Sequence, residues 1–87
     1  MSDRTALKGV LEIIMANKEE KSLNFAIGYT SHALKMLESG ASDEALYTQL
    51  LYLRGNLSNW RGGKAKEVRS IVDSFIKRLA PTRRKQQ

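Results

Sequence analysis

The chain has 87 residues, no cysteine and a formal net charge of +6. This length allows one domain, and the absence of cysteine excludes a disulfide framework and a thiolate metal site. No stretch approaches the roughly 18–20 apolar residues of a membrane span, and the first residues lack a secretory signal pattern. We therefore expect a cytoplasmic protein without membrane contact, with association with the nucleoid as one option.

Positive charge is concentrated in the second half of the chain. Residues 1–50 carry five Lys or Arg and seven Asp or Glu. Residues 51–87 carry ten Lys or Arg and only two Asp or Glu. Such asymmetry is typical of proteins that bind a polyanion or an acidic partner surface. The alternative is a protein that is simply basic, with no ligand for its charge.

Apolar residues recur at helical spacing in four segments, and no segment alternates apolar and polar residues as a half-buried strand would. The first predicted helix covers residues 3–16 and has Ser2 as its N-cap. Its apolar stripe consists of Leu7, Val10, Leu11, Ile14 and Met15.

The second predicted helix covers residues 22–38, with Ser22 as its N-cap and Gly40 just after its end. It has two apolar stripes, and a helix that is apolar on two faces is usually central in a bundle. We therefore expect it to contact more than one neighbour, with the single histidine, His32, partly buried in the core. The stripes are Leu23, Ile27, Thr30, Leu34 and Leu37, and Phe25, Tyr29, His32 and Met36.

The third predicted helix begins after its N-cap, Ser42, and continues to the Gly62–Gly63 pair. Its apolar residues recur in steps of four and three, which is the clearest helical signal in the chain. We expect Trp60 to belong to the core, although it could instead stack on a base or insert into a partner. The stripe consists of Leu46, Leu50, Leu53, Leu57 and Trp60.

The fourth predicted helix covers residues 64–79 and is stopped by Pro81. The domain thus spans residues 1–81, and residues 82–87 are expected to be a disordered basic tail. Four such helices predict an all-α, antiparallel four-helix bundle. The alternative is a three-helix core on which the first helix docks loosely.

The sequence favours a protein that binds over one that catalyses. One histidine on a helix face is weak ground for a hydrolytic triad or a metal site, and Asp43 and Glu44 are adjacent and point to different faces. The Gly62-Gly63-Lys64 element lacks the glycine spacing and the preceding strand of a phosphate-binding P-loop. We therefore predict no enzymatic activity, no cofactor and no metal.

Basic residues cluster around the start of the fourth predicted helix. Arg61, Lys64 and Lys66 lie where the helix dipole disfavours cations, so helix stability alone does not account for them. A helix start with free N–H groups and clustered bases is suited to a phosphate or a carboxylate. The predicted nucleic-acid-binding or anion-binding residues are Arg54, Ser58, Arg61, Lys64, Lys66, Arg69, Arg83, Arg84 and Lys85.

Two details of this segment bear on that prediction. Arg54, Ser58 and Arg61 share one face of the third predicted helix by their spacing. Poor helix formers interrupt the same segment, which indicates either a functional site or a frayed helix end. They are Gly55, Asn56, Ser58 and Asn59.

These observations lead to three functional hypotheses. The first is an accessory or adaptor protein that binds nucleic acid, or a larger nucleic-acid-handling protein, through the basic residues. The second is a DNA-binding regulator in which the third and fourth helices form a helix-turn-helix. The third is a protein-interaction scaffold without nucleic-acid contact, including a homodimer whose acidic and basic halves pair head to tail.

Overall fold

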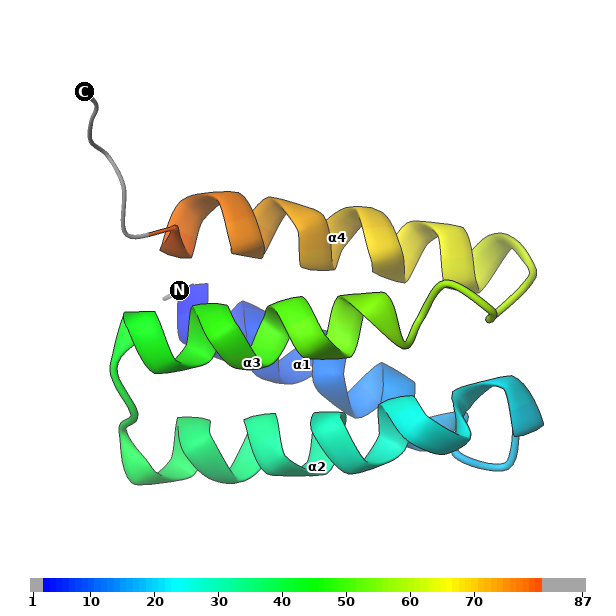
Figure 1. The fold of residues 1–87 in the computed structure, drawn as a ribbon, viewed down its shortest axis with the longest axis horizontal. Coiled ribbons are helices and arrows are strands. Elements are labelled where there is room, and N and C mark those ends of the chain that lie inside the picture. The colour runs from blue at the N-terminus through cyan, green and yellow to red at the C-terminus, as the bar shows by residue number, and fades with distance from the viewer. Residues whose placement is uncertain (1–2, 81–87) are drawn as a thin grey trace.

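The computed structural model of the protein describes residues 3–80, which form four α-helices joined by short connections (Figure 1). Helix α1 spans Asp3–Ala16, α2 spans Asn24–Ser39, α3 spans Asp43–Gly55 and α4 spans Gly63–Leu79. A single 3-10 turn, η1, covers Lys21–Leu23 just before α2. Residues 3–80 contain no strand, so the predicted all-α class is confirmed.

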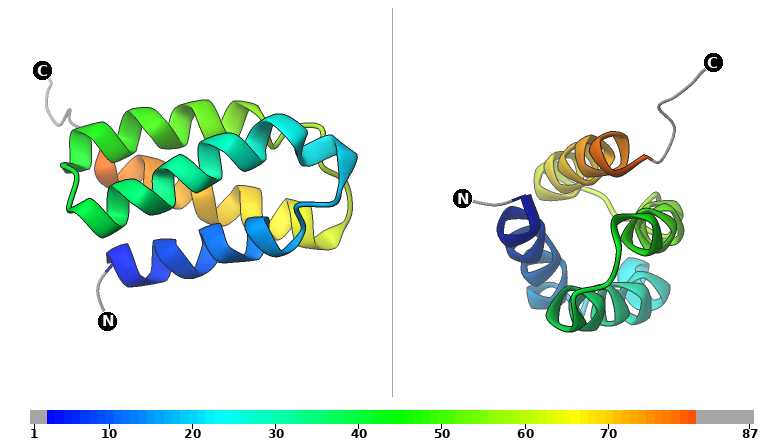
Figure 2. Two further views of the ribbon diagram at one scale, coloured as in Figure 1. Left: turned by 90° about the horizontal axis from the view of Figure 1, so that it is seen from below. Right: turned by 90° about the vertical axis from the view of Figure 1, so that its left-hand side faces the viewer.

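The helices form a four-helix bundle in which each packs against its neighbour in sequence. Helix α1 also packs against α4 and closes the ring, as the end-on view of Figure 2 shows. Leu7, Leu11 and Ile14 of α1 have exposed fractions of 1% or less, so this helix is an integral part of the core. The predicted bundle is therefore confirmed, and α1 is not the loosely docked helix of the alternative.

The core forms where the apolar stripes of the four helices meet. All five residues of the stripe predicted from Leu46 to Trp60 are buried, and Trp60 is only 3% exposed. The core placement of Trp60 is thus confirmed. Helix α4 contributes Ala65, Val68, Val72 and Phe75. Within residues 3–80, no helix has the length and apolar content needed to cross a bilayer.

Helix α2 begins later than predicted, and Ser22 is not its N-cap. Ser22 lies within η1, where the backbone N–H of Leu23 donates to the carbonyl oxygen of Glu20 at 2.9 Å. The N-cap of α2 is Leu23, which makes no side-chain capping hydrogen bond. The 3-10 turn tightens the entry into the helix and supplies local backbone hydrogen bonds there, as such turns often do at helix ends.

The buried face of α2 also differs from the prediction. His32 is exposed rather than partly buried, and Phe25 is 79% exposed. The fully buried residues of α2 are small: Ala26, Thr30 and Ala33 are each 0% exposed. The Thr30 hydroxyl is satisfied within the helix, since it donates to the carbonyl oxygen of Ala26 at 2.8 Å.

The connection between α2 and α3 has the predicted caps. Gly40 has a left-handed backbone, with φ +75°, and its N–H is directed to the carbonyl oxygens of Leu37 and Met36. The Ser42 hydroxyl accepts a hydrogen bond from the backbone N–H of Ala45 at 3.1 Å, so its role as N-cap is confirmed.

Candidate anion-binding surface at the α3–α4 connection

Helix α3 ends at Gly55, so the prediction that it continues to Gly62 is wrong. The polar residues that follow satisfy backbone carbonyls near its carboxyl end. The side-chain amide of Asn56 donates to the carbonyl oxygen of Tyr52 at 2.9 Å, and the Ser58 hydroxyl donates to that of Gly55 at 3.0 Å. Carbonyls at a helix end lack helical partners, which explains why poor helix formers occur here. The poor helix formers of this segment therefore mark the end of the helix.

Leu57 and Trp60 remain buried although neither is in a helix. The N–H of Leu57 donates to the carbonyl oxygen of Arg54 at 3.1 Å, and the N–H of Trp60 donates to that of Leu57 at 3.1 Å. These hydrogen bonds close two successive tight turns, and each turn ends on an apolar residue that lies in the core, first Leu57 and then Trp60. This spacing resembles that of a helix, which is why the apolar pattern alone predicted one.

Arg69, a predicted anion-binding residue, holds this connection against α4. Its guanidinium Nη1 donates to the carbonyl oxygen of Leu57 at 3.1 Å and to that of Trp60 at 2.6 Å. The side chain is partly buried and binds oxygens that precede α4 in the chain. Arg69 therefore positions the segment that carries the neighbouring basic residues.

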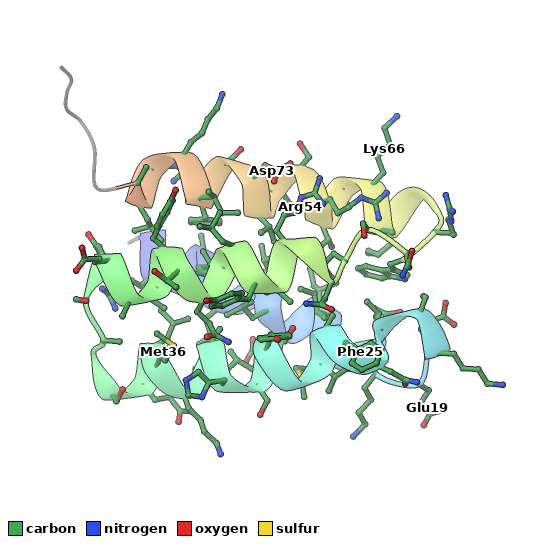
Figure 3. All side chains as sticks on the ribbon, viewed as in Figure 1. Glu19, Phe25, Met36, Arg54, Lys66 and Asp73 are labelled. Carbon is green, nitrogen blue, oxygen red and sulfur yellow. The ribbon has the colours of Figure 1, made fainter. Side chains whose placement is uncertain are left out.

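Arg54, another predicted site residue, is engaged in an ion pair. Its guanidinium Nε lies 2.7 Å from the Oδ1 of Asp73 and joins α3 to α4 (Figure 3). Both side chains are partly exposed, at 32% and 53%, so the pair contributes little to stability. The charge of Arg54 is largely compensated by this carboxylate.

Arg61, Lys64 and Lys66 are exposed, and within residues 3–80 none of them makes an ion pair. The N-cap of α4 is Gly62, with φ +105°, which has no side chain to accept a hydrogen bond from the first turn. The first turn of α4 has no acidic residue. Three positive side chains therefore flank a helix start that is itself positive and carries no side-chain cap. We call these three residues the basic surface.

The basic surface curves around the start of α4 and is not one flat face. Lys64 and Lys66 are two residues apart, so their side chains leave the helix roughly 200° apart. Lys66 projects away from the bundle in Figure 3. The helical face expected to join Arg54, Ser58 and Arg61 does not form, because the helix ends before Ser58. The predicted basic residues Arg83, Arg84 and Lys85 lie outside the described residues.

A second surface was not found by the sequence analysis. Phe25 and Tyr29 of α2 and Tyr52 of α3 are 79%, 37% and 57% exposed, and the two tyrosine rings stack with their centroids 5.9 Å apart. We call these three residues the aromatic surface. The signal that could have revealed it is an absence of charge, since no charged residue occurs between Lys21 and Lys35.

No protein-family model, no curated protein and no solved structure matches this chain. Within residues 3–80, no group of three His, Asp or Glu side chains is placed to hold a metal ion.

Proposed function

We propose that this protein is a non-enzymatic accessory protein of a nucleic-acid-processing complex, and that its basic surface binds the phosphate backbone. One observation carries the proposal: Arg61, Lys64 and Lys66 are exposed and crowd the positive end of α4, without an ion-pair partner among residues 3–80.

This arrangement is unfavourable in the isolated chain and favourable next to an anion. A cation exposed at a helix start costs about 0.3–1 kcal/mol against the helix dipole, and three such cations also repel one another. Phosphate groups placed around the helix start would attract both these side chains and the helix dipole, and these attractions would offset the cost. Free backbone N–H groups at a helix start add hydrogen-bond donors for these phosphates. The basic surface thus lowers the stability of the helix and favours the binding of an anionic ligand.

We favour binding to the nucleic-acid backbone over recognition of a base sequence. Lys and Arg contacts to phosphates provide affinity without sequence preference. The second hypothesis requires a helix-turn-helix, whose two helices cross at about 90–120°. Helices α3 and α4 instead run antiparallel along each other (Figure 1), which gives that hypothesis no geometric support.

Fluorescence anisotropy with a random-sequence DNA duplex and a single strand, over a series of NaCl concentrations, tests the proposal. We expect the variant R61Q/K64Q/K66Q to bind at least about tenfold more weakly at low salt. The slope of log K against log[NaCl] should also fall by about 0.9 for each lost contact to duplex phosphate.

The matched control removes the same charge elsewhere. The variant K8Q/K18Q/K35Q changes three exposed lysines that lie outside α3, α4 and their connection. We expect it to lose much less affinity, because only the long-range field changes. Equal losses in the two variants would show that net charge alone binds DNA, and no binding at low salt would contradict the proposal. Strong preference for one sequence would favour the regulator hypothesis instead.

A further inference from the structure

The rings of the aromatic surface face solvent where α2 and α3 pack side by side. Phe25 and Tyr29 are about one helical turn apart, so they share a face of α2. The rings of Tyr29 and Tyr52 are inclined by only 25° to each other and bridge the two helices. The Phe25 ring lies in front of the α2 ribbon in Figure 3, and most of its surface contacts solvent. Flat apolar rings are therefore open to a ligand on one side of the bundle.

An open hollow of about 360 Å³ lies beside these rings. Phe25, Gly28 and Tyr29 line it from α2, and the polar side chains of His32 and Gln49 complete its wall. The side-chain amide of Gln49 donates to the carbonyl oxygen of Tyr29 at 3.0 Å, which links the two helices at this place. Rings beside hydrogen-bonding side chains suit an unpaired nucleobase, because the rings stack on its face and the polar groups meet its edge.

The helix segments that carry the rings contain no carboxylate that would repel a phosphate. Residues 22–34 and residues 45–53 include no Asp, Glu, Lys or Arg. The connection before α2 is balanced, since residues 18–21 carry two Lys and two Glu. The whole chain carries +6, so a negatively charged ligand can reach the rings without local repulsion.

The aromatic surface and the basic surface lie toward the same end of the bundle. Phe25 follows the α1–α2 connection, and the basic surface flanks the α3–α4 connection, which lies at the same end (Figure 1). Figure 3 shows Phe25 and Lys66 toward this end. Helix α3 packs against both α2 and α4, and neighbouring helices lie about 8–10 Å apart. The path from α2 to α4 around the bundle is therefore about 20 Å, which a strand of about six nucleotides spans.

We propose that the aromatic surface binds the bases of a single-stranded nucleic acid whose phosphates contact the basic surface, which rests on the proposed function and specifies the form of nucleic acid. Proteins that bind single strands combine a positive surface for the backbone with aromatic side chains on which bases stack. Bases in a duplex are already stacked on one another and cannot use such rings. The rings therefore add affinity for single strands only.

The size of the aromatic surface favours bases over a protein partner. At about 200 Å² for each aromatic side chain, the exposed fractions of the three rings amount to roughly 350 Å². A stable protein interface buries about 800 Å² per partner. A few stacked bases need only the ring faces, because contacts to phosphates supply the remaining affinity. Trp60 is buried and cannot stack on a base, so the exposed rings of α2 and α3 take that role.

Fluorescence anisotropy on the full chain with three ligands of about 12 nucleotides or base pairs tests the proposal. The ligands are a thymidine strand, an abasic strand that keeps the phosphates, and a duplex of random sequence. We expect the thymidine strand to bind at least about fivefold more tightly than the abasic strand, because each base that stacks on an aromatic side chain contributes about fivefold or more. The abasic strand has the same charge, so the difference measures the bases alone.

Phe25→Leu and Tyr47→Leu form a matched pair for this measurement. Each variant replaces one ring by an apolar residue that favours the helix, and Tyr47 lies on α3 outside the aromatic surface. Phe25→Leu should weaken binding of the thymidine strand at least about fivefold and leave binding of the abasic strand and the duplex unchanged. Tyr47→Leu should leave all three unchanged, and Phe25→Tyr, which keeps a ring, should retain the affinity. Circular dichroism checks that the variants fold.

The salt dependence separates this proposal from the proposed function. The loss caused by Phe25→Leu should keep its size as NaCl rises, because stacking releases no counterions, whereas the loss caused by R61Q/K64Q/K66Q should shrink. A loss with Phe25→Leu but none with R61Q/K64Q/K66Q would overturn the role of the basic surface. Binding to none of the three ligands would overturn both proposals.

Tyr52→Leu provides an independent variant on α3, because its ring is 57% exposed, and it should weaken the thymidine strand as Phe25→Leu does. Equal binding of the thymidine and abasic strands would overturn the proposal and leave the proposed function standing. Unchanged binding of the thymidine strand by both Phe25→Leu and Tyr52→Leu would do the same. The aromatic surface would then be a site for a protein partner.

Discussion

At the scale of single residues, basic side chains within one short segment of the chain, residues 54–69, have different roles. Arg69 donates to two carbonyl oxygens of the α3–α4 connection, and Arg54 pairs with Asp73. Arg61 and Lys66 are exposed and have no ion pair within residues 3–80. The difference arises because only Arg69 and Arg54 have oxygen atoms within hydrogen-bonding distance among residues 3–80 of the folded chain.

The substitution Arg69→Met should lower the free energy of unfolding by about 2 kcal/mol, since hydrogen bonds from a charged donor contribute about 1.5–3 kcal/mol. Methionine keeps an apolar stem, so the loss is mainly that of the two hydrogen bonds to Leu57 and Trp60. Urea denaturation followed by circular dichroism measures it. Lys66→Met is the control and should change stability by less than about 0.5 kcal/mol. Similar losses in both variants would show that Arg69 has no special structural role.

At the scale of helices and their connections, backbone conformation decides where helices stop. Gly40 ends α2 in a left-handed conformation, and Ser42 then caps α3. Gly9 lies within α1, where the backbone is right-handed. Neither glycine has an atom within 4 Å of an added Cβ, so the two sites differ in backbone conformation and not in packing space.

Replacing each of these glycines by alanine should therefore change stability in opposite directions. Gly9→Ala should raise the free energy of unfolding by about 1 kcal/mol, because alanine favours the helix. Gly40→Ala should lower it by about 1–2 kcal/mol, because a Cβ atom is disfavoured in the left-handed region. Urea denaturation of both variants gives the comparison. A change of the same sign at both sites would contradict the structure of the α2–α3 connection.

At the scale of the whole molecule, like charges repel within a small bundle. The chain carries +6, and the ion pairs Arg4–Asp43 and Arg54–Asp73 are both partly exposed. Salt screens repulsion between surface charges and weakens exposed ion pairs, which contribute little. Screening by salt therefore removes more repulsion between like charges than attraction within ion pairs.

We therefore expect NaCl to stabilise the protein between about 0.02 M and 0.3 M, with a thermal midpoint that rises by a few degrees. Thermal unfolding of the R61Q/K64Q/K66Q variant should show a smaller rise, because three of the repelling charges are absent. A midpoint that falls with NaCl in the natural sequence would mean that ion pairs outweigh repulsion.

Much of the fold could be predicted from the sequence, because apolar spacing and caps are local properties. The bounds of α1 agree with the prediction, α4 begins one residue earlier than expected, and Ser42 and Gly40 have the expected capping roles. The error in the length of the third helix occurred because two structures share one apolar pattern. The buried residues Leu57 and Trp60 fit a helix or a pair of tight turns equally well.

The order of residues by itself determined the four helices, the leucine-rich core and the concentration of positive charge in the second half, since each follows from composition and periodicity along the chain. Only the tertiary structure decided which polar groups are satisfied and which apolar side chains stay exposed. Arg69 reaches the Trp60 carbonyl, and Phe25 remains in solvent, because helix packing sets the distances between residues that are separate in sequence. Distances of this kind leave no periodic signal in the chain.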